Sequence, residues 1–204
     1  MSHSETKLRE FIEEARALTQ QHSFSGPENK AMFWGHTADA DPKFNINGAS
    51  YHGRNNVLCA LYMQSADPDA YKLDTLNVID QIGSYFDRWA GSYPAEILDE
   101  AWDVYSEAFA NQARGDHIFI AANDMRDGDY FDRIELPIIR ERFSKVTILE
   151  PDIDTSGMFA CKVRHWDLEA WIGLQENQWK SPYYYLDGTP YPKELRPPPK
   201  RMNG

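Results

Sequence analysis

Apolar residues recur along the first part of the chain at the spacing of one face of a helix. The pattern over residues 4–21 predicts an amphipathic helix, with Ser4 suited to capping its start. Its apolar positions are Leu8, Phe11, Ile12, Ala15 and Leu18. Further helical segments are expected over 54–64 and 72–89, whereas the Asp- and Asn-rich stretch 38–53 is typical of a loop. The N-terminal part is therefore predicted to be largely helical.

A longer apolar stripe predicts a central helix that begins near Pro94 and ends near Gly115. A buried strand is expected over 117–122, after which Asp and Gly residues predict a turn. The short run that ends at Glu135, just before Pro137, is expected to be a second strand. This unit of helix, strand, turn and strand is the part around which we expect the fold to be organised.

The remainder of the chain continues the alternation of helical and extended patterns. A short helix is expected over 138–143, a buried strand over 145–149, a hairpin arm over 152–163 and a helix over 165–175. The Pro- and Tyr-rich end is expected to be extended. These elements predict a mixed α/β fold, with a helical N-terminal part packed on a small, largely parallel β-sheet and the functional site at their junction.

Length and charge narrow the classes of function. The 204 residues suit one domain of moderate size, which we divide into a domain over 1–150 and a C-terminal extension over 151–204. Lys and Arg number 21 against 32 Asp and Glu, and the net charge of −11 disfavours nucleic acid or an anionic membrane as partner. The N-terminus lacks the apolar core of a signal peptide, so we expect a cytoplasmic chain, or one secreted without a cleaved Sec signal.

Two cysteines, Cys59 and Cys161, lie in apolar surroundings. We expect two buried thiols, with a disulfide between them as the alternative. The sequence has no CxxC motif and no His or Cys spacing typical of zinc. No zinc site is therefore predicted.

Three kinds of side chain are candidates for the chemistry. Trp102 and Ser106 are four residues apart, so they lie on one face of the central helix, and Glu135 supplies a carboxylate. Trp34 ends a short apolar run beside Gly35, where a ligand can approach the backbone closely. The residues also allow a structural interpretation, in which both tryptophans are core rings and Glu135 ends a strand.

The segment Trp102-Asp-Val-Tyr-Ser106-Glu-Ala-Phe-Ala110, followed by a strand and then Glu135, resembles the ADP-ribosyl cyclase and NAD glycohydrolase family. The pattern of that family is W-x-x-x-S-x-x-F-A, a hydrophobic strand, and a catalytic Glu. Upstream, Phe33-Trp34-Gly35 resembles the family's tryptophan motif. The resemblance covers roughly residues 30 to 150.

The resemblance implies an ADP-ribosyl cyclase-like fold and cleavage of the bond between nicotinamide and ribose in NAD. The products would be nicotinamide and ADP-ribose, with cyclic ADP-ribose as a further product. Glu135 corresponds to the catalytic glutamate, and Trp102 and Trp34, with Phe33 beside the latter, to the rings that frame the nicotinamide or the purine. Ser106 corresponds to the residue near the ribose and its phosphate. NAD would be the substrate, with no other cofactor.

The acidic residues of this chain correspond less simply to those of the family. The segment 75–89, with Gly83 and Asp87, resembles the acidic helix of the family. Where the family carries its second acid, this chain has an apolar or amide residue, one of Asn77, Val78 and Ile79. Asp80 or Asp74 would have to replace that acid, and Asp80, between two isoleucines, is expected to point inward. Arg126 is a candidate for binding the pyrophosphate, or else an exposed turn residue.

With two cysteines, the chain resembles the cysteine-poor bacterial branch of the family, whose members are often toxins or effectors. An immunity or chaperone protein would then be a natural partner. Two other classes remain open. One is a catalytically inactive, cyclase-like protein that binds NAD or ADP-ribose or serves as an acidic interaction module, and the other is a sugar hydrolase with two carboxylates.

Overall fold

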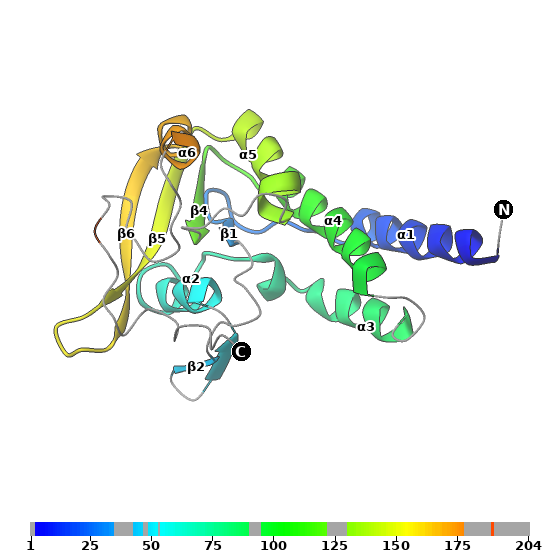
Figure 1. Cartoon of the computed structure of the whole chain (residues 1–204), viewed down its shortest axis with the longest axis horizontal. Helices are drawn as coiled ribbons and strands as arrows, with labels where there is room; N and C mark the ends of the chain where they lie inside the picture. The colour runs from blue at the N-terminus through cyan, green and yellow to red at the C-terminus, as the bar shows by residue number, and fades with distance from the viewer. Residues whose placement is uncertain are drawn as a thin grey trace, which may run out of the picture.

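The computed structural model describes residues 3–34, 43–46, 49–52, 54–89, 95–121, 130–177 and 189. In this part of the chain, helices surround a four-stranded open sheet, and a separate two-stranded hairpin lies beside them (Figure 1). None of the helices that the structure describes is long and apolar enough to cross a membrane.

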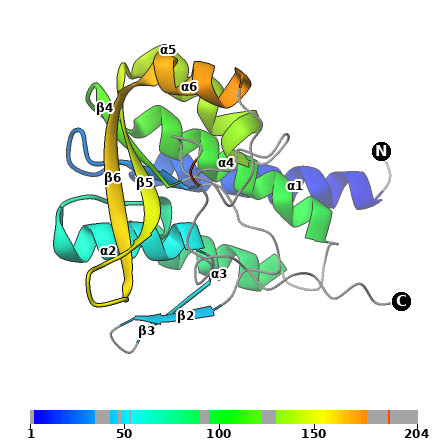
Figure 2. The same cartoon turned by 60° about the vertical axis from the view of Figure 1, so that its left-hand side comes forward.

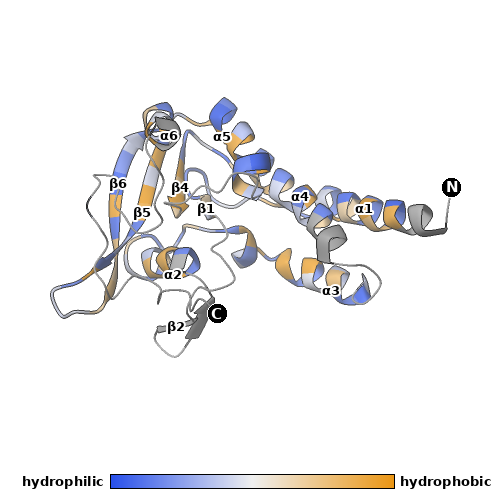
Figure 3. Ribbon diagram, viewed as in Figure 1, coloured by the Kyte–Doolittle hydropathy of each residue, from blue (hydrophilic) through white to orange (hydrophobic). Residues whose placement is uncertain are grey.

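The sheet has the strand order β1-β4-β5-β6. Its strands are β1 (Met32–Trp34), β4 (His117–Ala121), β5 (Lys145–Ile153) and β6 (Phe159–Asp167). Strands β1 and β5 both run parallel to β4, and β6 pairs antiparallel with β5. Figure 3 colours β4 and much of β5 as hydrophobic, as expected for strands covered on both faces. The prediction of a mixed α/β fold with a small, largely parallel sheet is confirmed.

Helices cover the two faces of the sheet unequally. The main core contains residues of α1 (His3–Gln21), α4 (Ala95–Gln112), α5 (Leu136–Arg142) and α6 (Leu168–Asn177). A smaller core packs α2 (Arg54–Ser65) against the other face. Ile118 and Ile120 of β4 belong to the first core and Phe119 to the second, because side chains alternate along a strand. Figures 1 and 2 show α1 and α4 side by side, extending away from the sheet.

The connection from α4 to β4 is fastened by one asparagine. The Asn29 Oδ1 atom accepts hydrogen bonds from the backbone N–H of Asp116 at 2.8 Å and of His117 at 3.1 Å. Gly115 has φ 99°, and a Cβ built on it would lie 2.1 Å from the same oxygen. Only glycine tolerates both the positive φ and this close approach. The connection thus sets where the first residues of β4 lie relative to the end of α4.

Two segments of the N-terminal half differ from the prediction. Strands β2 (Lys43–Ile46) and β3 (Ala49–His52) form an antiparallel hairpin inside the stretch that was expected to be a loop. The segment expected to be helical from residue 72 contains a 3-10 turn, η1 (Leu73–Thr75), and then α3 (Ile79–Trp89). Asp, Asn, Gly and Pro are depleted in strands, so the composition of this stretch favoured a loop.

The strand predicted before Pro137 is wrong. Residues 131–135 form a π-helical turn, η2 (Phe131–Glu135), that continues directly into α5. The Leu136 N–H donates to the Phe131 carbonyl, one residue farther back than in an α-helix. Pro137 has no N–H to donate, so the regular hydrogen bond from this position is absent and a wider turn is accommodated. The apolar residues here suit either period, which explains the error.

The C-terminal part joins the same sheet and core. The predicted hairpin is confirmed, but β6 continues through Asp167, so α6 begins at Leu168 instead of residue 165. The boundary expected at residue 150 falls inside β5, and Trp171 of α6 is fully buried in the main core. Residues 151–177 therefore complete the sheet that begins with β1. The Pro- and Tyr-rich end, apart from residue 189, lies outside the described residues.

Candidate active site

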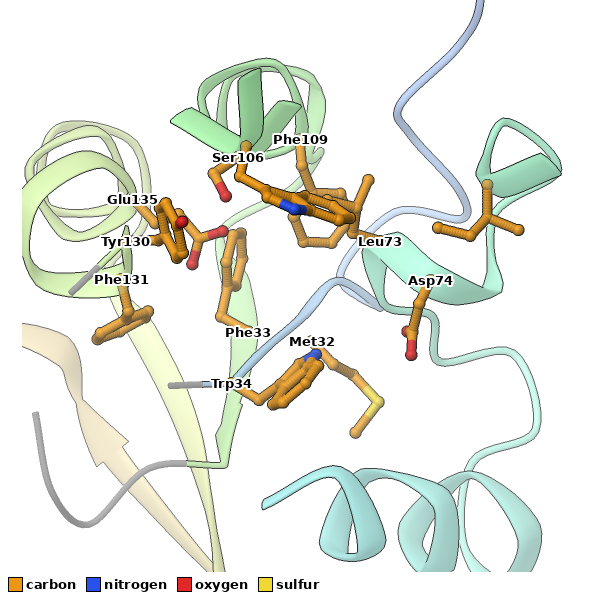
Figure 4. Close-up of a pocket in the computed structure, with 12 residues that line it drawn as sticks. Met32, Phe33, Trp34, Leu73, Asp74, Ser106, Phe109, Tyr130, Phe131 and Glu135 are labelled. Carbon is orange, nitrogen blue, oxygen red and sulfur yellow. The ribbon is translucent and has the colours of Figure 1, made fainter. Parts of the chain in front are cut away.

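A cavity of about 500 Å³ opens where the helices meet the sheet (Figure 4). Its volume falls within the roughly 300–1,000 Å³ of small-molecule sites. The lining side chains are Met32, Phe33, Trp34, Leu73, Asp74, Ile79, Trp102, Ser106, Phe109, Tyr130, Phe131 and Glu135. Most are apolar or aromatic, and a few polar groups point among them, which is the composition of a site for a small molecule with a flat ring.

The cavity lies beside the carboxyl end of β1, whose last residue is Trp34. In open sheets with parallel strands, ligands bind outside the carboxyl ends of the strands, because the connections leave a crevice there. The sheet order has β4 between β1 and β5, so the chain must cross over twice to build this edge. The connection from β1 to β4 contains η1 and α4, the connection from β4 to β5 contains η2, and all three elements supply side chains that line the cavity.

One wall of the cavity is helical, and we call the side chains of α4 and η2 that line it the helical wall. Trp102, Ser106 and Phe109 lie three or four residues apart on α4, so they face the same way. The Trp102 ring stacks on Phe86 of α3, with centroids 5.0 Å apart and an interplanar angle of 26°. Tyr105, three residues farther along the same helix, packs edge-on against Trp102 with ring centroids 6.0 Å apart. The orientation of Trp102 is thus set by aromatic packing.

Glu135 completes the helical wall from η2. Its side chain is 8% exposed, and Ser106 is 6% exposed. In Figure 4 the Ser106 hydroxyl and the Glu135 carboxylate both point into the cavity. A carboxylate in a largely apolar enclosure interacts more strongly with a nearby positive charge than it would in water. This wall can therefore stabilise a cation that develops beside it.

The facing wall comes from the end of β1 and from η1, and we call its side chains Trp34, Lys72 and Asp74 the strand wall. Trp34 and Asp74 line the cavity, with Asp74 on the side opposite Glu135 (Figure 4). Behind them the Lys72 ammonium lies 2.6 Å from Asp74 Oδ2 and 5.7 Å from the centroid of the Trp34 ring. Lys72 is 5% exposed. The negative charge of this wall is therefore paired with a buried cation.

The structure brings five of the predicted site residues to one cavity: Phe33, Trp34, Trp102, Ser106 and Glu135. It does not bring Asp80 or Asp87 there. Both are exposed on α3, and Asp80 lines a separate polar groove between α1 and α3, so the expectation that it points inward is wrong. Arg126 lies outside the described residues. The acid that does face the cavity is Asp74.

Sequence reasoning missed Lys72 altogether. Its neighbourhood was expected to be the start of a helix, in which a lysine followed two residues later by an aspartate is an ordinary exposed pair. Only the 3-10 turn at this point directs Lys72 inward and Asp74 toward the cavity. Tyr130 and Phe131 were missed as well, because the extended pattern assumed before Glu135 hides their helical spacing.

Neither cysteine lines this cavity. Cys59 and Cys161 are free, which confirms the expected thiols, although Cys161 is only partly buried. Burial raises the pKa of each thiol to about 12, so both stay protonated and unreactive near neutral pH. Within the described part of the chain, no cluster of three or more His, Cys, Asp or Glu residues is arranged to hold a metal ion.

Comparison with models of known protein families found no match for this chain, and comparisons with curated proteins and with solved structures found none either.

Proposed function

We propose that the chain cleaves the bond between nicotinamide and ribose in NAD, as an NAD glycohydrolase with an ADP-ribosyl cyclase-like fold. The observation that supports this is the convergence of Trp34, of Trp102 with Ser106, and of Glu135, from three separate segments of the sequence, on one cavity. These are the residues in which the sequence resembles that family.

The chemistry suits a cavity with one carboxylate at its helical wall. Nicotinamide in NAD is a cationic pyridinium that leaves as a neutral molecule, so no general acid is required. The ribose carbon becomes an oxocarbenium-like cation, and a preorganised carboxylate stabilises this charge as it develops. Glu135, 8% exposed, is the residue for this role, and its carboxylate also accepts hydrogen bonds from the ribose hydroxyls. The Ser106 hydroxyl, on the same wall, is suited to hold the ribose or its phosphate.

The aromatic lining supports binding of the leaving ring. An indole face attracts a cationic ring, and this contact is worth about 0.5–2 kcal/mol. Trp102 is held for such stacking by Phe86 and by Tyr105. After nicotinamide departs, water attacks the ribose carbon and gives ADP-ribose; attack by the adenine nitrogen would instead give the cyclic product. Asp74, the acid opposite Glu135, is the residue we assign to the second carboxylate of the family.

Such an activity depletes NAD in any cell that contains the active chain, which suits a toxin or effector. An immunity or chaperone protein would then protect the producing cell. We therefore expect cytosolic expression to be toxic and the substitution Glu135→Gln to relieve the toxicity.

The decisive experiment is to incubate the purified chain with NAD and to measure free nicotinamide, ADP-ribose and cyclic ADP-ribose by chromatography. Glu135→Gln should lower the rate of nicotinamide release by about 10³-fold, because it removes the charge that stabilises the oxocarbenium ion while keeping the shape of the side chain. Glu141→Gln is the matched control, since Glu141 is exposed on α5. Circular dichroism would verify that each variant is folded.

Two results would refute the proposal. One is that the folded wild-type chain releases no nicotinamide. The other is that Glu135→Gln turns over NAD as fast as the control variant. If the wild-type chain binds NAD by calorimetry without cleaving it, the second candidate, a non-catalytic NAD-binding protein, replaces the first.

A further inference from the structure

The strand wall is organised around one buried lysine. Lys72 is 5% exposed, whereas lysines are almost never buried without partners, because an ammonium loses its hydration there. It lies where three separate segments of the chain meet, namely the end of β1, the start of α2 and the turn η1. A group that is costly to bury at such a junction requires a compensating set of contacts.

The contacts of Lys72 are short and directional. Its Nζ atom donates to Asn56 Oδ1 at 2.6 Å and to Asp74 Oδ2 at 2.6 Å. The same ammonium lies 5.7 Å from the centroid of the Trp34 ring, within the distance of a cation–π contact. An ammonium has three donors, so two of them are used by these oxygens. One side chain therefore connects both cavity-lining residues of this wall.

The backbone around Lys72 is held independently of its ammonium. The Lys72 N–H donates to the Thr75 hydroxyl at 3.0 Å, and that hydroxyl donates back to the Lys72 carbonyl at 2.9 Å. The preceding residue, Tyr71, exchanges backbone hydrogen bonds with the segment that leads into β1. Loss of the ammonium should thus leave the turn in place while releasing the side chains of Asp74 and Trp34.

The Asp74 carboxylate has a second oxygen atom that can accept a hydrogen bond from a ligand. Its Oδ2 atom is bound by Lys72, and among the described residues its Oδ1 atom accepts no hydrogen bond. The side chain is 38% exposed and lines the cavity. An ammonium that fixes one oxygen of a carboxylate also fixes the direction of the other.

We propose that Lys72 is a positioning residue, which holds the Asp74 carboxylate and the Trp34 ring so that the free Asp74 oxygen accepts a hydrogen bond from an N–H or O–H group of the ligand. The proposal rests on the proposed function for its substrate, NAD. The proposal also assigns different parts of the substrate to the Trp34 ring and the Trp102 ring. A cationic ring is opposed at Trp34 by the ammonium already beside that indole, so the pyridinium stacks on Trp102 and a neutral part of the substrate contacts Trp34.

A double-mutant cycle tests whether Lys72 acts through Asp74. Lys72→Met and Asp74→Asn are each expected to raise KM for NAD about 10-fold with a smaller change in kcat, because a hydrogen bond to a charged acceptor is lost or misdirected. The double variant should be no worse than Asp74→Asn alone. Lys72→Arg keeps the charge and should restore part of the affinity. Additive effects of the two single variants, or an unchanged KM in Lys72→Met, would overturn the proposal.

Two further measurements keep the test decisive. In nuclear magnetic resonance spectra of chain with ¹⁵N-labelled lysine, the shielded, hydrogen-bonded Lys72 ammonium should give a slowly exchanging signal that disappears in Asp74→Asn; its persistence in that variant would count against the contact. If the wild-type chain releases no nicotinamide, the proposed function is refuted but the positioning role of Lys72 is not. The double-mutant cycle is then measured with the dissociation constant of ADP-ribose in place of KM. If calorimetry then shows no binding of ADP-ribose either, the proposed function and the positioning role of Lys72 are both overturned.

Discussion

The helical wall and the strand wall of the cavity are held in place by different forces. On the helical wall, the Trp102 ring is in contact with the rings of Phe86 and Tyr105, and Phe109 is in contact with Phe33 at a centroid distance of 4.9 Å. On the strand wall, Trp34 and Asp74 share contacts with the ammonium of Lys72. The first arrangement depends on many apolar contacts, each of them weak, and the second depends on one buried charge.

This difference predicts how each wall responds to the substitution of a single residue. Loss of one aromatic partner leaves the others of a packed cluster in place, so the helical wall should change gradually with substitution. Removal of the Asp74 carboxylate leaves the buried Lys72 ammonium without its compensation, and removal of Lys72 releases both Asp74 and Trp34, so the strand wall should fail abruptly. The chemistry that we assign to Glu135 thus sits on the more robust wall.

The largest expected difference between the two walls lies in the turnover of variants of their two tryptophans. Trp102→Ala should lower kcat/KM for NAD by about 30-fold, since it removes a cation–π contact of up to about 2 kcal/mol with the pyridinium. Trp34→Ala should lower it by only about 3-fold, because Lys72 already faces that ring. Steady-state kinetics with both variants decides this, and Trp102→Phe serves as the control that keeps an aromatic face. An equal or larger loss in Trp34→Ala would show that the pyridinium lies at the strand wall.

A second prediction concerns the end of α4, which carries the helical wall. The Arg142 guanidinium donates to the carbonyls of Ala110, Asn111 and Ala113, which have no partners within the helix beyond them. Arg142→Gln should lower the free energy of unfolding by about 1–3 kcal/mol, because hydrogen bonds to a charged donor are lost at the helix terminus.

Urea denaturation measures this effect, and Arg140→Gln is its matched control. Arg140 pairs with Glu169 at 2.9 Å, but both side chains are exposed, so its loss should change stability by no more than about 0.5 kcal/mol. Turnover per folded molecule should be unchanged in both variants. A loss of turnover in folded Arg142→Gln would mean that the helical wall depends on its terminus as sharply as the strand wall depends on Lys72.

The smallest expected effect lies in a hydrogen-bonded group of the sheet that belongs to neither wall. The Thr147 hydroxyl, fully buried, lies 2.8 Å from His117 Nε2 and 2.8 Å from His165 Nδ1. Burial, with smaller contributions from the positive charges of His165, Lys30 and Lys145, lowers the pKa of His117 below its usual 6.5. The neutral form is therefore favoured in the folded state. Its contribution to stability is fully present above about pH 6.5 and is lost as the pH falls through the lower, folded value.

Unfolding free energies measured between pH 8 and pH 5 should accordingly fall less steeply in His117→Gln than in the wild-type chain. If His117→Gln also altered KM at constant pH, the sheet could no longer be regarded as a support that is separate from the two walls.

Several parts of this architecture were predictable from short stretches of sequence. The helices that became α1 and α4 and the buried strand β4 follow from apolar periodicity within each segment. The shared direction of Trp102 and Ser106 follows from their spacing of four residues on a helix, whatever the rest of the chain does. These features depend on neighbours in the sequence, so a local pattern contains the necessary information.

Other parts were decided only in three dimensions. Glu135 was identified as a residue of interest, but its place on a π-helical turn depends on how Pro137 is accommodated where α5 joins the core. The choice of Asp74 over Asp80, and the burial of Lys72, depend on contacts among β1, α2 and η1. Periodicity specifies which face of a helix is apolar, whereas the direction of a side chain on a short turn is set by partners far along the chain, which only the folded structure brings together.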